Sequence, residues 1–120
     1  MTKILIVDDH PDIRQLIRLT LGSQYEIHEA ADATTALRLA REHRPHVVVM
    51  DIMMPGEMDG LQALQAIRSD ATLSETKVIM VTARASANDQ ATALEYGAHG
   101  YFCKPFSPVQ LVNSIKGMIG

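Results

Sequence analysis

The sequence predicts an α/β fold in which a doubly wound, parallel β-sheet is covered by helices on both faces. Two observations lead to this prediction. Short apolar, β-branched segments alternate five times along the chain with segments whose apolar residues have helical spacing. Several of the short segments are apolar at every position, which is typical of strands buried on both faces. This alternation favours parallel strands joined by right-handed helical crossovers.

The first two strand–helix units lie within residues 4–43. Ile4 to Val7 is an unbroken apolar run and is predicted as a buried strand. Helical spacing follows between Pro11, near the expected helix start, and Gly22, after its end. Tyr25 to Ala30 alternates and carries charged side chains, so we interpret it as an edge strand. A stripe of small residues that begins after Asp32, a good helix cap, predicts the second helix.

Two further buried strands and two helices are predicted in the second half of the chain. Val47 to Met50 and Val78 to Val81 are apolar throughout. One helix is expected after Gly60, from its apolar spacing. Another is expected between Ser86, which begins a capping-box-like pattern, and Gly97, which suits the position just after a helix end.

The last unit is a weaker fifth strand, Gly100 to Cys103, followed by a helix after Ser107 and Pro108. The length of 120 residues suits one compact domain, so we expect residues 1–120 to form a single unit. The only cysteine, Cys103, excludes an intrachain disulfide and is expected to be a buried strand thiol.

Charge and hydropathy exclude several classes of function. The formal net charge of −3 does not provide the basic stripe of a nucleic-acid-binding module. The longest aliphatic or methionine runs contain four residues, whereas a membrane span needs about 20. We therefore expect a cytoplasmic domain that contacts neither nucleic acid nor membrane directly.

Acidic residues follow two of the predicted strands. Asp8 and Asp9 come directly after the first strand, and Asp51 comes directly after the third. Ligands bind outside the carboxyl ends of strands in open parallel sheets. If these strands are neighbours, three carboxylates converge, and their repulsion raises at least one pKa unless a cation is bound. Oxygen ligands of this kind suit Mg²⁺. The alternative, that these residues only cap helices, is weaker for three carboxylates than for one.

Two more polar residues are expected at the same sheet edge. Thr82 ends the fourth strand, and Lys104 follows the fifth. Lys104 could simply neutralise the acidic residues. The same set also suits phosphoryl transfer, in which catalysis is mostly positioning and charge neutralisation.

Taken together, these residues resemble the receiver domain of two-component response regulators, over essentially the whole chain. The resemblance implies a flavodoxin-like (βα)5 three-layer sandwich with strand order 2-1-3-4-5. The motifs that carry it are Ile6-Val7-Asp8-Asp9, Asp51-Ile52-Met53-Met54-Pro55-Gly56 with Asp59-Gly60 following, Val81-Thr82-Ala83 and Lys104-Pro105-Phe106.

The resemblance implies that Asp51 is a phosphoacceptor. It would take a phosphoryl group from a phosphohistidine on a sensor histidine kinase or a histidine phosphotransfer protein. Asp8, Asp9 and Asp51 would hold Mg²⁺ together with the backbone carbonyl of Met53, with Asp9 a more direct ligand than Asp8.

The resemblance also assigns roles beyond the acidic cluster. Thr82 and Lys104 would contact the phosphoryl oxygens, and the peptide bond between Lys104 and Pro105 would be cis. Tyr101 would be an aromatic switch that turns inward when Thr82 moves toward the phosphoryl group. The surface made by the fourth helix, fifth strand and fifth helix would then control an effector domain or output partner.

Such a domain is not an enzyme in the usual sense, because it catalyses only its own phosphotransfer and dephosphorylation. It would be a monomer or a weak, phosphorylation-dependent dimer. One alternative is an aspartyl-phosphate phosphohydrolase, but these typically carry a second Asp where Met53 stands. Flavin binding is disfavoured because Asp8 and Asp9 would repel the phosphate. A scaffold receiver that is never phosphorylated usually lacks a site residue, and none is lacking here.

Some features depart from the family pattern or remain open. The stretch from Pro55 to Leu61 is one residue longer than usual. Met53 and Arg84 are expected to border the site and tune the phosphoryl lifetime.

The histidines show no helical i, i+4 spacing typical of metal sites, so we expect packed or solvated side chains. Phe106 could anchor a partner or pack under the last helix.

Overall fold

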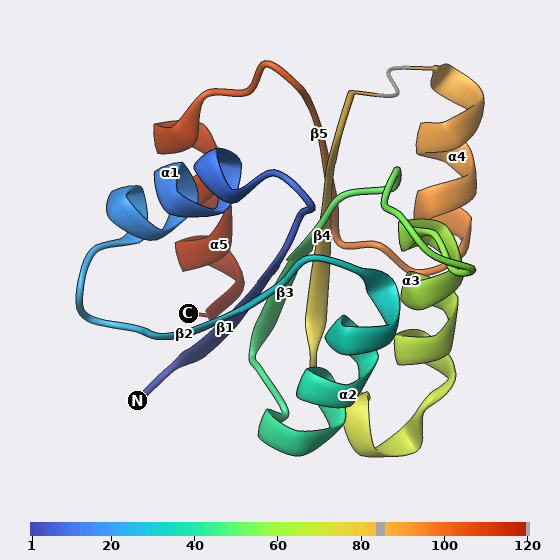
Figure 1. Cartoon of the computed structure of the whole chain (residues 1–120), viewed down its shortest axis with the longest axis horizontal. Helices are drawn as coiled ribbons and strands as arrows, with labels where there is room; N and C mark the ends of the chain where they lie inside the picture. Colours follow the sequence, from blue (N-terminus) through green and yellow to red (C-terminus); the bar gives the residue numbers. More distant parts are fainter. Residues whose placement is uncertain (84–85, 120) are drawn as a thin grey trace.

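The computed structural model describes residues 1–83 and 86–119. Five parallel strands form one sheet in the order β2-β1-β3-β4-β5, which confirms the predicted fold class (Figure 1). In chain order the elements are β1 (Lys3–Val7), α1 (Pro11–Leu21), β2 (Glu26–Ala30), α2 (Ala33–His43), β3 (Val47–Met50), α3 (Gly60–Ser69), the short 3-10 helix η1 (Ala71–Leu73), β4 (Lys77–Thr82), α4 (Ala87–Glu95), β5 (Gly100–Cys103) and α5 (Pro108–Ile119).

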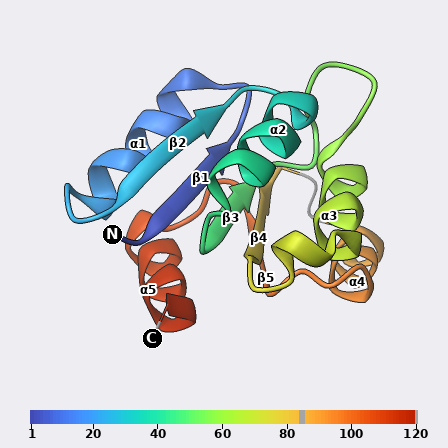
Figure 2. The same cartoon turned by 90° about the horizontal axis from the view of Figure 1, so that it is seen from below.

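The sheet is the middle of three layers. Helices α1 and α5 cover one face, and α2, α3 and α4 cover the other (Figure 2). Successive residues of β1 enter opposite layers: Leu5 packs with α2 and α3, whereas Ile4 and Ile6 pack with α1 and α5. Strands β1, β3 and β4 are buried on both faces, which explains their unbroken apolar runs.

The two edge strands differ from this pattern. Strand β2 is an edge strand, as predicted, and most of its residues are only partly buried. The prediction that Cys103 is buried is wrong, because this residue ends the opposite edge strand, β5, and is exposed. Phe106, left open by the sequence, is partly buried and packs against the core between the sheet and helices α1 and α5.

Side chains before the helices satisfy backbone N–H groups that lack partners in the first turn. The side chain of Asp32 accepts a hydrogen bond of 2.7 Å from the Thr35 N–H at the start of α2, as predicted. Asp59 and Gln62 form a reciprocal capping box at the start of α3. This second cap fixes the end of the long loop from β3 to α3.

Candidate functional site

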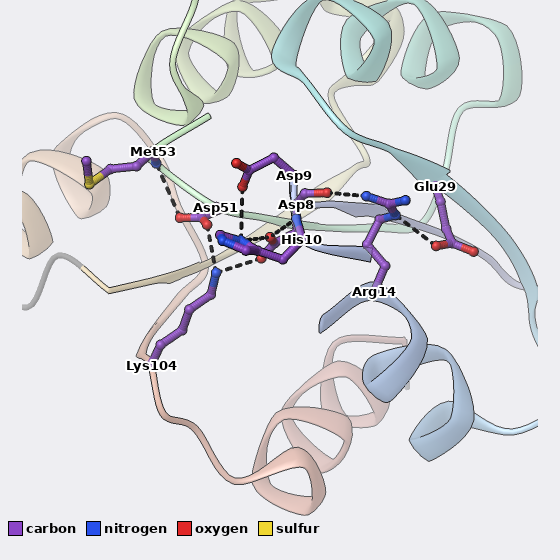
Figure 3. A network of polar contacts seen from close by, with 8 residues as sticks. All are labelled: Asp8, Asp9, His10, Arg14, Glu29, Asp51, Met53 and Lys104. Atoms are coloured by element: carbon purple, nitrogen blue, oxygen red, sulfur yellow. Dashed lines mark hydrogen bonds and ion pairs between the residues drawn. The ribbon is translucent and has the colours of Figure 1, made fainter. Parts of the chain in front are cut away.

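Three carboxylates meet at the carboxyl ends of β1 and β3 (Figure 3). The Asp51 N–H donates to the Val7 carbonyl over 3.0 Å, so the ladder continues past the strand ends and brings Asp51 beside Asp8. Asp8 and Asp51 are only 3% and 4% exposed, respectively. Carboxylates from Asp8, Asp9 and Asp51 offer oxygen atoms that lie within 4.8 Å of one another.

Lys104 connects two of these carboxylates. Its Nζ donates to Asp8 Oδ2 and to Asp51 Oδ2, each over 2.7 Å. Its backbone N–H donates to the Thr82 carbonyl over 2.8 Å, which fixes Lys104 beside the end of β4. Burial by itself lowers the pKa of the Lys104 ammonium, but the hydrogen bonds to Asp51 and Asp8 and their negative charges outweigh it and raise the pKa. Lys104 therefore stays protonated and offsets part of the acidic charge.

Both side-chain oxygens of Asp51 have a donor. Oδ1 accepts from the Met53 N–H over 3.2 Å, and Oδ2 accepts from Lys104. Thr82 is fully buried at the end of β4, the strand next to β3. The peptide bond between Lys104 and Pro105 is cis, as the resemblance implied. Asp51 is thus held in a fixed orientation at the bottom of the site.

Asp9 and His10 complete the acidic cluster. Asp9 Oδ1 is buried and accepts no hydrogen bond, and its nearest charged partner is His10 Nδ1 at 3.1 Å. His10 Nδ1 also lies 3.0 Å from Asp8 Oδ1. The hydrogen bond with Asp8 and the charge of Asp9 raise the pKa of His10. Helix α1 has His10 at its cap position and no side-chain cap, so the predicted alternative that Asp9 caps this helix does not hold.

Arg14 is a supporting residue that the sequence did not reveal. Its guanidinium donates to the Asp8 backbone carbonyl over 2.6 Å and to Glu29 over 3.0 Å. It therefore fixes the Asp8 backbone from helix α1 while being held by strand β2 (Figure 3). A sequence pattern could not indicate this contact, because Arg14 and Glu29 lie in different elements.

The model of the response regulator receiver domain matches residues 4–116 of this chain. The chain belongs to the response regulator receiver family. Receiver domains are signalling modules of two-component systems rather than classical enzymes. The acidic pocket of Asp8, Asp9 and Asp51 is consistent with the phosphoacceptor site of this family.

Solved structures and curated relatives agree with this assignment. A CheY-like receiver domain protein from Methanospirillum hungatei JF-1 is 31% identical, with a TM-score of 0.89 over 98% of this chain and 92% of that one. The BeF3-activated DrrB receiver domain is 29% identical, with a TM-score of 0.90 over 99% of this chain and 97% of that one. The transcriptional regulatory protein SrrA of Staphylococcus aureus is 37% identical over 98% of this chain and 47% of its own length. The chain spans about half the length of the curated relatives it matches.

Receiver domains bind Mg²⁺, and the residues of this receiver domain fit such an ion. The buried Asp9 Oδ1 makes no hydrogen bond, and its charged neighbour at 3.1 Å is the exposed His10 imidazole, so this oxygen is available to a cation. The side chains of Asp8 and Asp51 supply further hard oxygen ligands beside it.

The described helices include none that is long and apolar enough to cross a membrane.

An open cleft of about 810 Å³ leads to the cluster, and its lining includes Asp9, Asp51, Met53 and Lys104. Met53 is 58% exposed and lies at this cleft, as predicted. Tyr101 is not among the cleft residues; it is partly buried on β5 and packs against the core on the face of the sheet that α2, α3 and α4 cover (Figure 2). Arg84, the other residue expected to border the site, lies outside the described residues.

Gly60 fixes the approach of α3 to the receiver site. A Cβ atom placed on Gly60 would lie 1.9 Å from the Asp51 carbonyl oxygen and 2.8 Å from the Ile52 Cα. The Gly60 N–H also donates to the Ile52 carbonyl over 2.8 Å. The loop from β3 to α3 contains a second special glycine, Gly56, whose φ of 101° is rarely adopted by other residues. Gly56 lies within the stretch from Pro55 to Leu61 that is one residue longer than the family pattern, and Asp51 stays at the sheet edge through its hydrogen bond to Val7.

Proposed function

We propose that Asp51 accepts a phosphoryl group from a phosphohistidine of a sensor histidine kinase or a histidine phosphotransfer protein. The observation that carries this proposal is the bridge from Lys104 to both Asp8 and Asp51, beside Asp9 Oδ1, which accepts no hydrogen bond. A carboxylate that attacks a phosphoryl group must overcome repulsion between like charges. A fixed ammonium at 2.7 Å from the acceptor reduces that repulsion without reorganisation.

In the proposed transfer, an oxygen of Asp51 forms a bond to phosphorus while the bond from phosphorus to the imidazole nitrogen of the donor breaks. The electron pair of that bond stays on the leaving imidazole. The Met53 N–H orients the other Asp51 oxygen, and Lys104 balances charge on the incoming phosphoryl oxygens. Asp8, Asp9, Asp51 and the Met53 carbonyl would hold Mg²⁺, which, when bound, shields the charge between the acceptor and the phosphoryl group.

The consequence of phosphorylation is a change in a distant surface. We propose that Thr82 and Lys104 contact the phosphoryl oxygens and that Tyr101 turns inward as Thr82 moves. The position of Thr82 at the end of β4, next to β5 with Tyr101, supports this coupling. The surface of α4, β5 and α5 would then control an effector domain or an output partner.

The remaining parts of the proposal concern context. Residues 1–120 would form one receiver domain, cytoplasmic and without direct contacts to nucleic acid or membrane. It would be a monomer or a weak dimer that forms on phosphorylation. Phosphohydrolase activity is disfavoured because Met53 stands where a second acid would be needed. A scaffold that is never phosphorylated is disfavoured by the complete set of site residues.

The acceptor is tested by incubating the protein with Mg²⁺ and phosphoramidate or acetyl phosphate and recording its intact mass. We expect one phosphoryl adduct, which is lost in Asp51→Asn and strongly reduced in Asp9→Ala. The matched control is Asp70→Asn, since Asp70 caps η1 away from the site and Asn is an equally good cap. Absence of an adduct on the wild-type protein would contradict the proposal.

The switch needs a separate test. Beryllofluoride, a phosphoryl analogue, is added with Mg²⁺ while the aromatic side-chain NMR signals of Tyr101 are followed. We expect these signals to shift. If they stay constant while the backbone signal of Asp51 changes, Tyr101 is not the switch, and the assignment of Asp51 is unaffected.

A further inference from the structure

A second cluster of metal-ligating side chains lies at the β2 edge of the sheet. Glu26 and His28 are two residues apart on this edge strand, so both side chains point to the same face, toward α2. His43 lies in the last turn of α2 and reaches the same place. One potential ligand atom from each of the three side chains lies within 4.8 Å of the other two.

The two histidines of this cluster are already arranged side by side. Their imidazole rings stack with centroids 3.8 Å apart and an angle of 17° between the ring planes. His28 Nε2 lies 2.8 Å from Glu26 Oε2. Because a carboxylate only accepts hydrogen bonds, His28 Nε2 donates in this contact. This hydrogen bond also lowers the pKa of Glu26, which keeps the carboxylate ionised.

We propose that Glu26, His28 and His43 form a binding site for Zn²⁺. Two imidazole nitrogens and one carboxylate oxygen are a common ligand set for this ion. Ligands at 2.0–2.1 Å in a tetrahedral site lie roughly 3.4 Å from one another. A metal ion lies in the plane of each imidazole that binds it, so the stacked rings must separate and turn until their planes converge on the ion. The Nε2 proton of His28 would move to Nδ1 through solvent, and the hydrogen bond to Glu26 would be replaced by two metal bonds.

The surroundings of the cluster suit an ion that enters from solvent. The His28 and Glu26 side chains are 25% and 41% exposed, because β2 has no neighbour on its outer side. A fourth position thus remains open for water or for a ligand from a partner. One feature opposes the ion: Lys3 Nζ donates to the His43 carbonyl over 3.3 Å, so one positive charge lies close to the site. The bound ion would connect the edge strand β2 to the end of α2.

Among the described residues there is one other cluster of this kind, and it is the receiver site itself. That cluster is built from carboxylates with His10, and its oxygen ligands favour Mg²⁺. The β2 cluster has two imidazoles and one carboxylate, which favours Zn²⁺ over Mg²⁺. The two sites can therefore be distinguished by their metal preference. The sequence alone did not reveal the β2 cluster, because its histidines lie on a strand and a helix rather than on one helix.

The test is a calorimetric titration of the protein with Zn²⁺ in excess Mg²⁺, which occupies the acidic cluster. The background is Cys103→Ser, since the exposed thiol is itself a zinc ligand. We expect one Zn²⁺ per chain, and affinity losses of about tenfold or more in His28→Gln and in His43→Gln. His99→Gln, at the opposite end of the sheet, is the matched control, and its Zn²⁺ affinity should equal that of the Cys103→Ser protein. Lys3→Gln should bind more tightly, because a nearby positive charge is removed.

Side-chain nitrogen NMR signals provide a second readout that does not depend on the stability of variants. With Zn²⁺ added to the Cys103→Ser protein in excess Mg²⁺, the imidazole nitrogens of His28 and His43 should shift together. The proposal is overturned if these nitrogens do not shift, or if replacing His28 and His43 leaves the Zn²⁺ affinity unchanged. Because phosphorylation at Asp51 is measured separately, neither result bears on the proposed receiver function.

Discussion

Replacing Gly60 by alanine would push a methyl group into the backbone of Asp51. The added Cβ would lie 1.9 Å from the Asp51 carbonyl oxygen, whereas non-bonded heavy atoms are at their best separation near 3.5 Å. Either α3 or the loop after β3 must therefore move by roughly 1.6 Å to restore contact distance. The obstacle is backbone rather than the end of a flexible side chain, so a rotamer change does not relieve it.

Two consequences follow from this displacement. A shift of about 1 Å in a positioned reacting group costs about 100-fold in rate, so phosphorylation of Gly60→Ala should slow by about that factor. Overpacking of this kind also destabilises the fold by about 1–3 kcal/mol. The rate is measured by intact mass with phosphoramidate and Mg²⁺, at a temperature where the variant is folded. The unfolding free energy is measured by urea denaturation.

Gly117→Ala is the matched control. A Cβ at Gly117 meets no atom within 4 Å, and this residue lies inside helix α5. The substitution should leave the phosphorylation rate unchanged and stabilise the fold by up to about 1 kcal/mol. The steric reasoning is refuted if Gly60→Ala is phosphorylated as fast as the wild-type protein and unfolds at the same urea concentration.

Three more perturbations test other parts of the structure by urea denaturation. Lys104→Met leaves two buried carboxylates without their ammonium and should lower the unfolding free energy at neutral pH by about 2 kcal/mol. Burial, helped by the charges of Arg68 and Lys77, lowers the pKa of His99 in the folded protein. Below the ordinary value of 6.5 the unfolded chain binds this proton more readily than the folded one, so stability decreases as the pH falls. This decrease should be smaller in His99→Gln. Asp32→Ala removes the α2 cap and should cost about 1 kcal/mol at neutral pH. Because hydrogen bonds from α2 lower the pKa of Asp32, its contribution is present above the ordinary value of 3.8 and disappears as the pH falls further.

Each of these outcomes has a clear opposite. If Lys104→Met and the wild-type protein are equally stable, both measured without Mg²⁺, the ammonium of Lys104 does not stabilise the buried carboxylates. An equal decline of wild-type and His99→Gln stability between neutral pH and mildly acidic pH would show that His99 is not held neutral by the fold. For Asp32, the same stability loss at neutral pH and in strong acid would indicate a packing effect rather than a lost cap.

Much of the fold followed from the sequence because the buried strands have no polar face. The short runs at Ile4 to Val7 and Val47 to Met50 are typical of strands covered on both sides, and in a parallel sheet the acids that follow them lie at one edge. The pattern left the strand order open; the resemblance supplied the order 2-1-3-4-5, which places the first and third strands side by side and brings Asp8 to Asp51.

Other features depend on contacts between distant elements and left no local signal. Arg14 binds the Asp8 backbone from a helix surface, and an arginine on a helix surface gives no sequence signal of such a contact. Cys103 was misjudged because strand residues in a parallel sheet are usually buried, but this one ends an edge strand. The stack of His28 on His43 joins residues from a strand and a helix, which periodicity cannot pair.

The central claim is that a phosphoryl group is attached to the side chain of Asp51. Borohydride reduces an acyl phosphate on aspartate to homoserine, which leaves a permanent mark that survives digestion. After treatment with phosphoramidate, Mg²⁺ and borohydride, tandem mass spectrometry should find homoserine at position 51. Homoserine at another aspartate, or a phosphoryl group retained on a histidine with residue 51 unmodified, would contradict the account.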